Sequence, residues 1–261
     1  MKVASWNVNS LNVRLPHLNT WLAAAMPDIV ALQETKLEDG KFPVEAIAAL
    51  GYQCAFSGQK TYNGVALLAR QPLRDVVTDI PGLTDPQRRI LAATVGDPAA
   101  PSQQLRIINL YVVNGQSVGS EKFAYKLDWL AKVRDFLAAE LQRYPQMIVL
   151  GDFNIAPDDR DVHDPAAWHE QILCSSAERA ALAQLHALGL HDSFRLFEQE
   201  PGIYSWWDYR MGAHRRNLGL RIDLILVSDA LRARCRSATI DREPRRWERA
   251  SDHTPVLVEL A

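Results

Sequence analysis

The sequence predicts a layered α/β sandwich, in which two packed β-sheets carry helices on their outer faces. The 261 residues are 48% hydrophobic, which is enough to bury a sizeable core. Strand-like runs outnumber amphipathic helices and follow one another closely, which favours packed sheets over a parallel doubly wound sheet. No long polar linker divides the chain, so we expect a single domain over residues 1–261.

Ten segments show the apolar or alternating pattern of β-strands and are bounded by turn or polar residues. Ten strands are more than one sheet comfortably holds, which is why we expect two sheets. In chain order the segments are 2–8, 28–34, 52–57, 63–70, 89–95, 105–113, 147–153, 202–207, 221–228 and 255–260.

Three helices are predicted, over residues 16–26, 122–143 and 177–188. The first two place leucine and other apolar side chains on one face at helical spacing. The third is preceded by Ser175, and Glu178 follows at the spacing of a capping box, which indicates a helix start.

Polar side chains recur where the predicted strands leave the sheets. A carboxylate, an amide or an aromatic hydroxyl stands at the end of several apolar runs, and two further positions near the C-terminus continue the pattern. The residues are Asn7, Glu34, Tyr111, Asp152, Asn154, Asp223, Asp252 and His253. An unpaired carboxylate in a dry interior costs several kcal/mol, so Asp223, inside an apolar run, should face a cation, a histidine or strong donors. Convergence on one site would satisfy all of these groups.

Taken one at a time, these residues also have ordinary structural explanations. Glu34 could be a solvated strand end, and Asp152 with Asn154 could form an Asx turn. His253 could lie at the surface, and Tyr111 could be a core residue with its hydroxyl at the rim.

Charge is distributed unevenly along the chain. The formal net charge is -2, which argues against indiscriminate affinity for polyanions. Residues 205–249, however, contain eleven arginines, no lysine and six acidic residues, for a net charge of +5. This segment is either a solvated arginine-rich face or an anion-binding surface.

The remaining composition predicts a cytoplasmic protein without a membrane segment. The apolar run near the N-terminus, residues 21–26, is far shorter than the ~20 residues of a membrane span, and polar residues interrupt the place of a signal peptide. Cys54, Cys174 and Cys235 are odd in number and widely spaced, which is typical of reduced thiols in small core positions.

Seven motifs, found in order from residue 2 to the last strand, resemble the exonuclease III family of bacterial DNA-repair nucleases. This family is part of the wider endonuclease, exonuclease and phosphatase superfamily. GDFN with SDH alone would indicate only the superfamily, which includes lipid phosphatases and sphingomyelinases; WNVNSL, LQETK and GLRID resemble the DNA-repair branch. The motifs are WNVNSL (6–11), LQETK (32–36), YNGVA (62–66), GDFNIAP (151–157), WWDYR (206–210), GLRIDLIL (219–226) and SDHTPV (251–256).

The resemblance implies a four-layer α/β sandwich like that of deoxyribonuclease I, with a metal site at one end of the two sheets. The implied site contains Glu34, with Asn7 close by, and Asp152, Asn154, Asp252 and His253 as further candidate ligands. Carboxylates and amides without cysteine suit a hard cation, so we expect Mg²⁺, with Mn²⁺ as a substitute and zinc disfavoured.

The expected chemistry is in-line attack of water on a phosphodiester or phosphomonoester. Asp152 would take the proton of the water, and Asn154 would orient it. His253, paired with Asp223, would donate to a phosphoryl oxygen, and Tyr111 would contact the phosphate or the leaving group.

Substrate residues are also implied by the resemblance. Trp206 would line a pocket for an abasic or terminal deoxyribose, whereas Trp207 is as well explained by core packing. Asn114 would contact a phosphate. The arginines expected to meet DNA phosphates are Arg88, Arg89, Arg215, Arg216 and Arg221. The expected substrate is double-stranded DNA with an abasic site, a nick or a recessed 3' end, and we expect the protein to act as a monomer.

His169, beside Trp168, departs from the pattern of the family. Its ring either packs against a loop or narrows the groove through which an uninterrupted strand must pass. The second interpretation favours 3' ends over internal abasic sites. The balance among abasic-site incision, 3'-to-5' exonuclease and 3'-phosphatase activities therefore stays open.

Two other functions remain open from the sequence. A superfamily phosphatase acting on a small-molecule or lipid phosphate would share the same core residues. A catalytically silent DNA-binding module is disfavoured, because every position needed for a metal and a base is filled by a competent residue.

Overall fold

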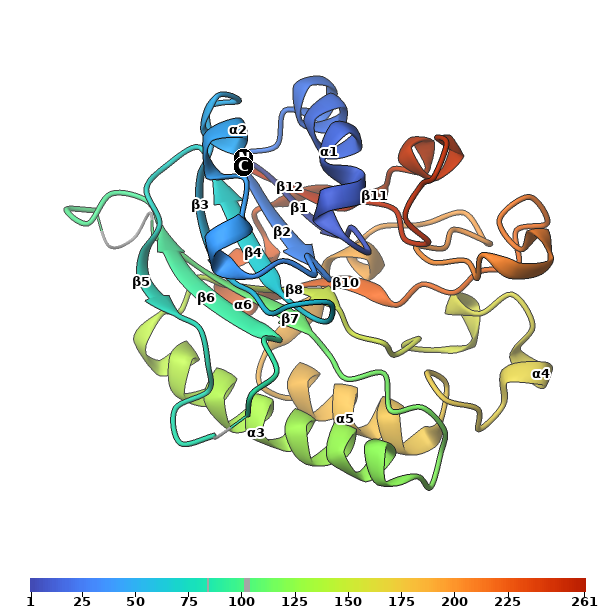
Figure 1. Ribbon diagram of the computed structural model, residues 1–261. Helices are drawn as coiled ribbons and strands as arrows, with labels where there is room; N and C mark the ends of the chain where they lie inside the picture. Colours follow the sequence, from blue (N-terminus) through green and yellow to red (C-terminus); the bar gives the residue numbers. More distant parts are fainter. Residues whose placement is uncertain (84, 101–103) are drawn as a thin grey trace.

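Two six-stranded mixed β-sheets pack face to face, and helices cover their outer faces (Figure 1). The computed structural model describes residues 1–83, 85–100 and 104–261. This arrangement confirms the predicted α/β sandwich.

The first sheet has the strand order β11-β12-β1-β2-β4-β3. In it, β1 and β2 run parallel and the other neighbours are antiparallel. Its strands are β1 (Lys2–Asn7), β2 (Ile29–Gln33), β3 (Gln53–Ser57), β4 (Val65–Ala69), β11 (Cys235–Ile240) and β12 (Val256–Leu260).

The second sheet has the order β5-β6-β7-β8-β10-β9. Here β7 and β8 run parallel, with Tyr111 opposite Asp152, and β10 runs antiparallel to β8, with Asp223 opposite Asp152. Pairing alone therefore brings three predicted site residues side by side. The strands are β5 (Arg74–Val77), β6 (Ile90–Val95), β7 (Leu105–Tyr111), β8 (Met147–Asp152), β9 (Leu190–Asp192) and β10 (Asp223–Ser228).

The helices lie outside the sheets, with α1 and α2 over the first sheet and α3 and α5 over the second (Figure 1). None of the helices in the described part of the chain has the length and apolar character needed to cross a membrane. They are α1 (Leu11–Ala25), α2 (Val44–Ala48), α3 (Glu121–Arg143), α4 (Pro165–Trp168), α5 (Ser176–His186) and α6 (Asp229–Arg232).

The helix predictions were correct in position and wrong at one boundary. α3 and α5 match the predicted ranges to within two residues, and the capping box of Ser175 and Glu178 is present. α1 begins at Leu11, and Pro16 lies inside it. The helix therefore begins before the proline that the sequence suggested as its start. Its first residue, Leu11, is buried.

The strand predictions contain one error and three omissions. Residues 202–207 do not form a strand; within them Trp206 makes only isolated bridges to Leu220 and His253. β5, β9 and β11 were not predicted. β5 and β11 are edge strands with partly exposed, polar-rich sequences, and β9 spans three residues, so none carries a clear apolar pattern.

The core between the two sheets is built from branched aliphatic side chains such as Ile29, Leu67, Ile107 and Leu150. Within it, Gln33 Nε2 donates to Asn109 Oδ1 at 2.8 Å. The Asn109 amide in turn donates to the carbonyl oxygens of Leu32 and Ala66, at 2.9 Å each. Because buried polar groups require their partners, these bonds favour one alignment of the sheets.

Candidate active site

The predicted site residues meet at one end of the sandwich. Asn7, Tyr111 and Asp152 are the last residues of β1, β7 and β8, Glu34 follows β2, and Asp223 begins β10. The parallel pairs β1–β2 and β7–β8 end at the same edge, so their terminal side chains are brought together.

Asp152 is the centre of this group and is buried. Its Oδ2 accepts from Asn7 Nδ2 at 2.9 Å, and its Oδ1 accepts from the backbone N–H of Asn154 at 2.9 Å. The second bond is the Asx turn that the sequence allowed as a structural explanation. The Asx turn does not exclude a functional role for these residues. Within it, Asn154 Nδ2 also donates to Asp152 Oδ2 at 3.3 Å.

Gly151 is required by the close approach of β7. Its φ is +144°, and an added Cβ would lie 1.8 Å from the carbonyl oxygen of Leu110. Two neighbouring site residues also have left-handed backbones, Glu34 with φ 52° and Asn154 with φ 49°. Positive φ values at non-glycine residues are uncommon and cluster at functional sites.

His253 is held by Asp223. Its Nδ1 donates to Asp223 Oδ2 at 2.8 Å and lies 3.1 Å from Oδ1, while Nε2 lies 3.7 Å from Asp152 Oδ2. All three side chains are buried. The imidazole is therefore hydrogen-bonded to Asp223 through Nδ1 and turns Nε2 toward the Asp152 carboxylate.

The buried charges shift the titration of this group. Burial lowers the pKa of His253, but Asp223 and Asp152 outweigh it and raise this pKa to about 10. Burial raises the pKa of Asp152; His253 lowers it, Asp223 raises it again, and the result is about 7. At neutral pH the imidazole is therefore charged, while the Asp152 carboxyl is close to its titration midpoint.

Glu34, Asp152 and His253 bring three potential metal-ligand atoms together, and while the imidazole is charged the two carboxylates are the ligands available. One ligand atom from each lies within 4.8 Å of the others. Asn7 Nδ2 donates to Glu34 Oε1 at 2.9 Å, so its amide lies at the same place. Carboxylate oxygens are the ligands that hard cations prefer, so Glu34 and Asp152 fit such an ion.

The predicted ligand Asp252 is not part of this group. Its Oδ1 accepts from Asn9 Nδ2 at 2.9 Å and its Oδ2 from Trp206 Nε1 at 3.0 Å. Burial raises the pKa of Asp252, but His253 and these hydrogen bonds lower it below its usual value. Asp252 thus orients Trp206 next to the site.

Comparison with known proteins agrees with this geometry. The family model described as "Endonuclease/Exonuclease/phosphatase family" matches residues 4–253. The chain belongs to the endonuclease/exonuclease/phosphatase family.

Three individual proteins are similar to this chain over its whole length. It is 36% identical to exodeoxyribonuclease III of Haemophilus influenzae, over all of both chains. Its structure is similar to that of a 3'-5' exonuclease, NExo, from Neisseria meningitidis, with 49% identity and a TM-score of 0.95 over 100% of this chain and 99% of the other. It is also similar to an AP endonuclease from Archaeoglobus fulgidus, with 34% identity and a TM-score of 0.93 over 100% and 99%.

Lys36, in the LQETK motif, belongs to the site although it was not predicted. Its Nζ lies 2.9 Å from Glu34 Oε2 and donates to Asn9 Oδ1 at 2.5 Å. Lys36 and Glu34 both have left-handed backbones, so the turn between them folds the ammonium back onto the carboxylate. Only the motif itself could have indicated this contact.

Asn114 and Trp206 lie beside the residues around Asp152. Asn114 Nδ2 donates to Asn154 Oδ1 at 3.2 Å. Asn114 also lines a pocket of about 740 Å³ together with Arg89, Tyr62 and Lys122. Trp206 is half-buried and its backbone bridges to His253.

The predicted arginines have different surroundings. Arg215 and Arg216 are exposed. Arg88 is half-buried and pairs with Asp79 at 2.9 Å, whereas Arg89 is buried over the ring of Tyr111.

Arg221 was expected to contact DNA, and this prediction is wrong. Its side chain is 1% exposed and pairs with Asp161 at 2.6 Å and Asp192 at 2.7 Å. The arginine of the GLRID motif therefore anchors the loop after β8 to β9, because a buried guanidinium needs carboxylate partners.

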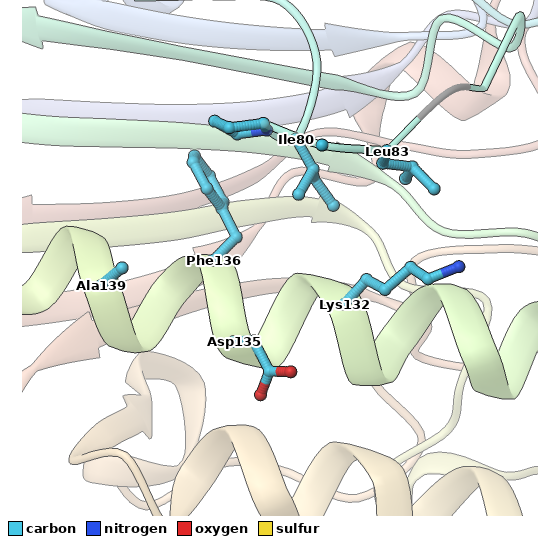
Figure 2. A pocket seen from close by; sticks show the side chains of 8 residues that line it. Ile80, Leu83, Lys132, Asp135, Phe136 and Ala139 are labelled. Carbon is cyan, nitrogen blue, oxygen red and sulfur yellow. The ribbon is translucent and has the colours of Figure 1, made fainter.

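A separate pocket of about 390 Å³ lies between α3 and residues 80–83 (Figure 2). Figure 2 shows the apolar side chains of Ile80, Leu83 and Phe136 facing it. None of the predicted site residues lines this pocket, so it is not where the carboxylates and His253 meet.

Proposed function

We propose that this protein is a metal-dependent DNA-repair phosphoesterase that hydrolyses phosphate esters at 3' ends or abasic sites of duplex DNA. The buried arrangement of Asp223, His253 and Asp152 beside Glu34 is the observation that carries the proposal. The relatives support the substrate class, since they are named as an exodeoxyribonuclease III, an AP endonuclease and, bound to a DNA hairpin, a 3' phosphatase.

Mg²⁺ is the proposed ion, with Mn²⁺ as a substitute. Glu34 and Asp152 would hold it, because carboxylate oxygens suit these cations, and the amide groups of Asn7 and Asn154 hydrogen-bond to these carboxylates. When bound, such an ion neutralises phosphate charge and stabilises the departing oxygen.

The side chains divide the remaining chemistry. Asp152 accepts the proton of the attacking water, and Asn154 orients that water. His253, charged at neutral pH, donates to a phosphoryl oxygen and is kept in place by Asp223. Burial, followed by the charges of Glu34 and Asp152, raises the pKa of Tyr111 well above its usual value, so it contacts the phosphate or leaving group as a neutral hydroxyl.

The surroundings of the site support binding of a DNA duplex. Asn114 and Trp206 flank the carboxylates, and the exposed Arg215 and Arg216 would contact phosphates without reading sequence. We further propose that residues 1–261 act as one domain and as a monomer in the cytoplasm.

The test is incubation of the purified protein and Mg²⁺ with three labelled duplexes. One carries an internal abasic site, one a nick with a 3'-phosphate, and one a recessed 3'-hydroxyl. We expect chelator-sensitive processing of at least one. Activity on inositol phosphates with none on these duplexes would favour a phosphatase, and metal-independent binding without cleavage would indicate a binding module.

His169 provides a test of the balance among the activities. It lies exposed on the loop after α4. We propose that its ring restricts an uninterrupted strand and so favours 3' ends over internal abasic sites. In a His169→Gly variant, abasic-site incision should therefore become faster relative to removal of a 3'-phosphate; an unchanged ratio would contradict the proposal.

A further inference from the structure

A buried ion pair beneath the site joins α3 to α5. The side chains of Lys126 and Glu178 are both 0% exposed and in direct contact. Moving two charges out of water is costly, and an apolar pair of similar volume is often at least as stable. Stability alone is therefore a weak reason for this pair.

The three protons of the Lys126 ammonium have three acceptors. One is the Glu178 carboxylate, and the others are the carbonyl oxygens of Asn114 at 3.1 Å and Asn154 at 2.7 Å. Both asparagines present their side chains to the site. One ammonium thus holds the backbone of the loops that follow β7 and β8.

Glu178 fixes a third loop, residues 169–175. Its carboxylate accepts from the N–H of Leu173 at 3.1 Å, from the N–H of Ser175 at 3.1 Å and from Ser175 Oγ at 2.6 Å. The ion pair is therefore the common anchor of three loops, two of which carry Asn114 and Asn154 beside Asp152.

Asn154 needs such an anchor. Its φ of 49° lies in the left-handed region. This conformation costs free energy, which surrounding contacts must offset. Its Nδ2 reaches both Val112 O, at 3.0 Å, and Asp152 Oδ2. A small rotation of the backbone would move this amide away from the carboxylate.

We propose that Lys126 is a positioning residue for hydrolysis, which holds the carbonyl groups of Asn114 and Asn154 so that the Asn154 amide stays on Asp152. This inference rests on the role proposed above for Asn154. Lys126 itself is buried under the loops and acts only through the two asparagines.

The decisive variant is Lys126→Met combined with Glu178→Gln, which removes both charges and leaves side chains of similar length. Lys126→Met alone would leave the buried Glu178 carboxylate without its counter-charge. Lower activity could then result from misfolding as well as from lost positioning. The matched control is Arg106→Met with Glu140→Gln. It removes another buried ion pair of α3, at 2.5 Å, located at the opposite end of β7 from Tyr111.

We expect the K126M/E178Q protein to lose ~10²-fold in kcat, the scale of a small misplacement of reacting groups, and its KM to rise because Asn114 loses its anchor as well. The control variant should keep both constants. Without substrate, the side-chain amide NMR signal of Asn154 should shift in K126M/E178Q and stay in place in the control.

Adding Asn154→Ala to K126M/E178Q should cause little further loss, because both changes remove the same interaction. Fully additive losses, or normal kcat in folded K126M/E178Q, would overturn the inference. Near-normal turnover in N154A alone would overturn it by another route, since Asn154 would then have no role in the reaction.

Glu178→Gln alone is the second test and covers the case in which the double variant does not fold. It keeps the ammonium and both of its carbonyl bonds but removes the counter-charge, so the unfolding free energy should fall, while turnover of the folded variant should remain close to wild type. A ~10²-fold loss in folded E178Q would assign the effect to the loop at residues 169–175 and contradict the role of Lys126.

Discussion

Asp152 and His253 are the side chains on which the proposed reaction depends most. Changing Asp152 to Asn, or His253 to Ala, should lower turnover on the preferred DNA substrate by at least ~10²-fold, the scale of losing one preorganised interaction. Steady-state kinetics measure the loss, and circular dichroism checks that the fold persists. Turnover close to wild type in either folded variant would remove that residue from its assigned role.

The Asp223–His253 pair also makes stability depend on pH. The pKa of His253 rises from 6.5 to about 10 on folding, so the folded protein binds this proton more tightly than the unfolded chain. The resulting stabilisation is complete below pH 6.5, declines as pH rises, and is lost above about pH 10. Asp223→Asn removes the main charge that raises this pKa.

In metal-free buffer, we therefore expect the difference in unfolding free energy between wild type and Asp223→Asn to shrink between pH 6.5 and 10. Urea denaturation at several pH values measures this difference. An NMR titration should show the His253 ring still protonated at pH 8 in the wild type, and losing its proton at lower pH in the variant. A difference independent of pH would contradict the pairing.

Among the elements, β7 and β8 approach so closely at Gly151 that no side chain fits between them. Because a Cβ on Gly151 would lie 1.8 Å from the Leu110 carbonyl oxygen, the strands must separate to accept alanine. Gly151→Ala should cost at least about 3 kcal/mol of unfolding free energy, at the upper end of overpacking effects. The control is Gly40→Ala, since a Cβ there would have no atom within 4 Å apart from its chain neighbours, and urea denaturation of both variants makes the comparison.

At the same scale, the sequence predicted the buried strands and long helices but not the edges of the sheets. β1, β2, β4, β7 and β8 have strongly apolar sequences whose burial the pattern reports directly. β5 and β11 are stabilised mainly by pairing with a neighbour, which short polar sequences do not reveal. The aromatic residues of segment 202–207 resemble those of a strand, but the segment does not form one. Trp207 packs in the interior instead, as the core-packing interpretation predicted.

For the molecule as a whole, the exposed arginines should determine how DNA binding responds to salt. Replacing Arg215 and Arg216 by Gln should weaken duplex binding and reduce the slope of log K against log[salt] by about 1 for each phosphate that is no longer bound. Fluorescence anisotropy at several salt concentrations measures the slope. The control is Lys132→Gln, which removes an exposed charge beside the pocket of Figure 2 and should leave the slope unchanged.

How much of the site could be predicted depends on whether the sequence around a residue reveals its surroundings. The residues at the strand ends, from Asn7 to His253, were found because repeated polar side chains after apolar runs leave a visible signal. Lys126 left none, because a lysine on an amphipathic helix is ordinarily solvated. Arg221 was misplaced for the converse reason, since sequence does not tell a buried arginine with carboxylate partners from a surface one.

The order in which the group Glu34, Asp152 and His253 is encoded has a consequence during synthesis. Glu34 and Asp152 are made before His253 and before the strand that follows it, β12. β12 inserts between β11 and β1, so β1 can pair with β2 early but gains its second neighbour only after β12 is made. A chain made only as far as β11 therefore lacks both His253 and the strand that joins β11 to β1.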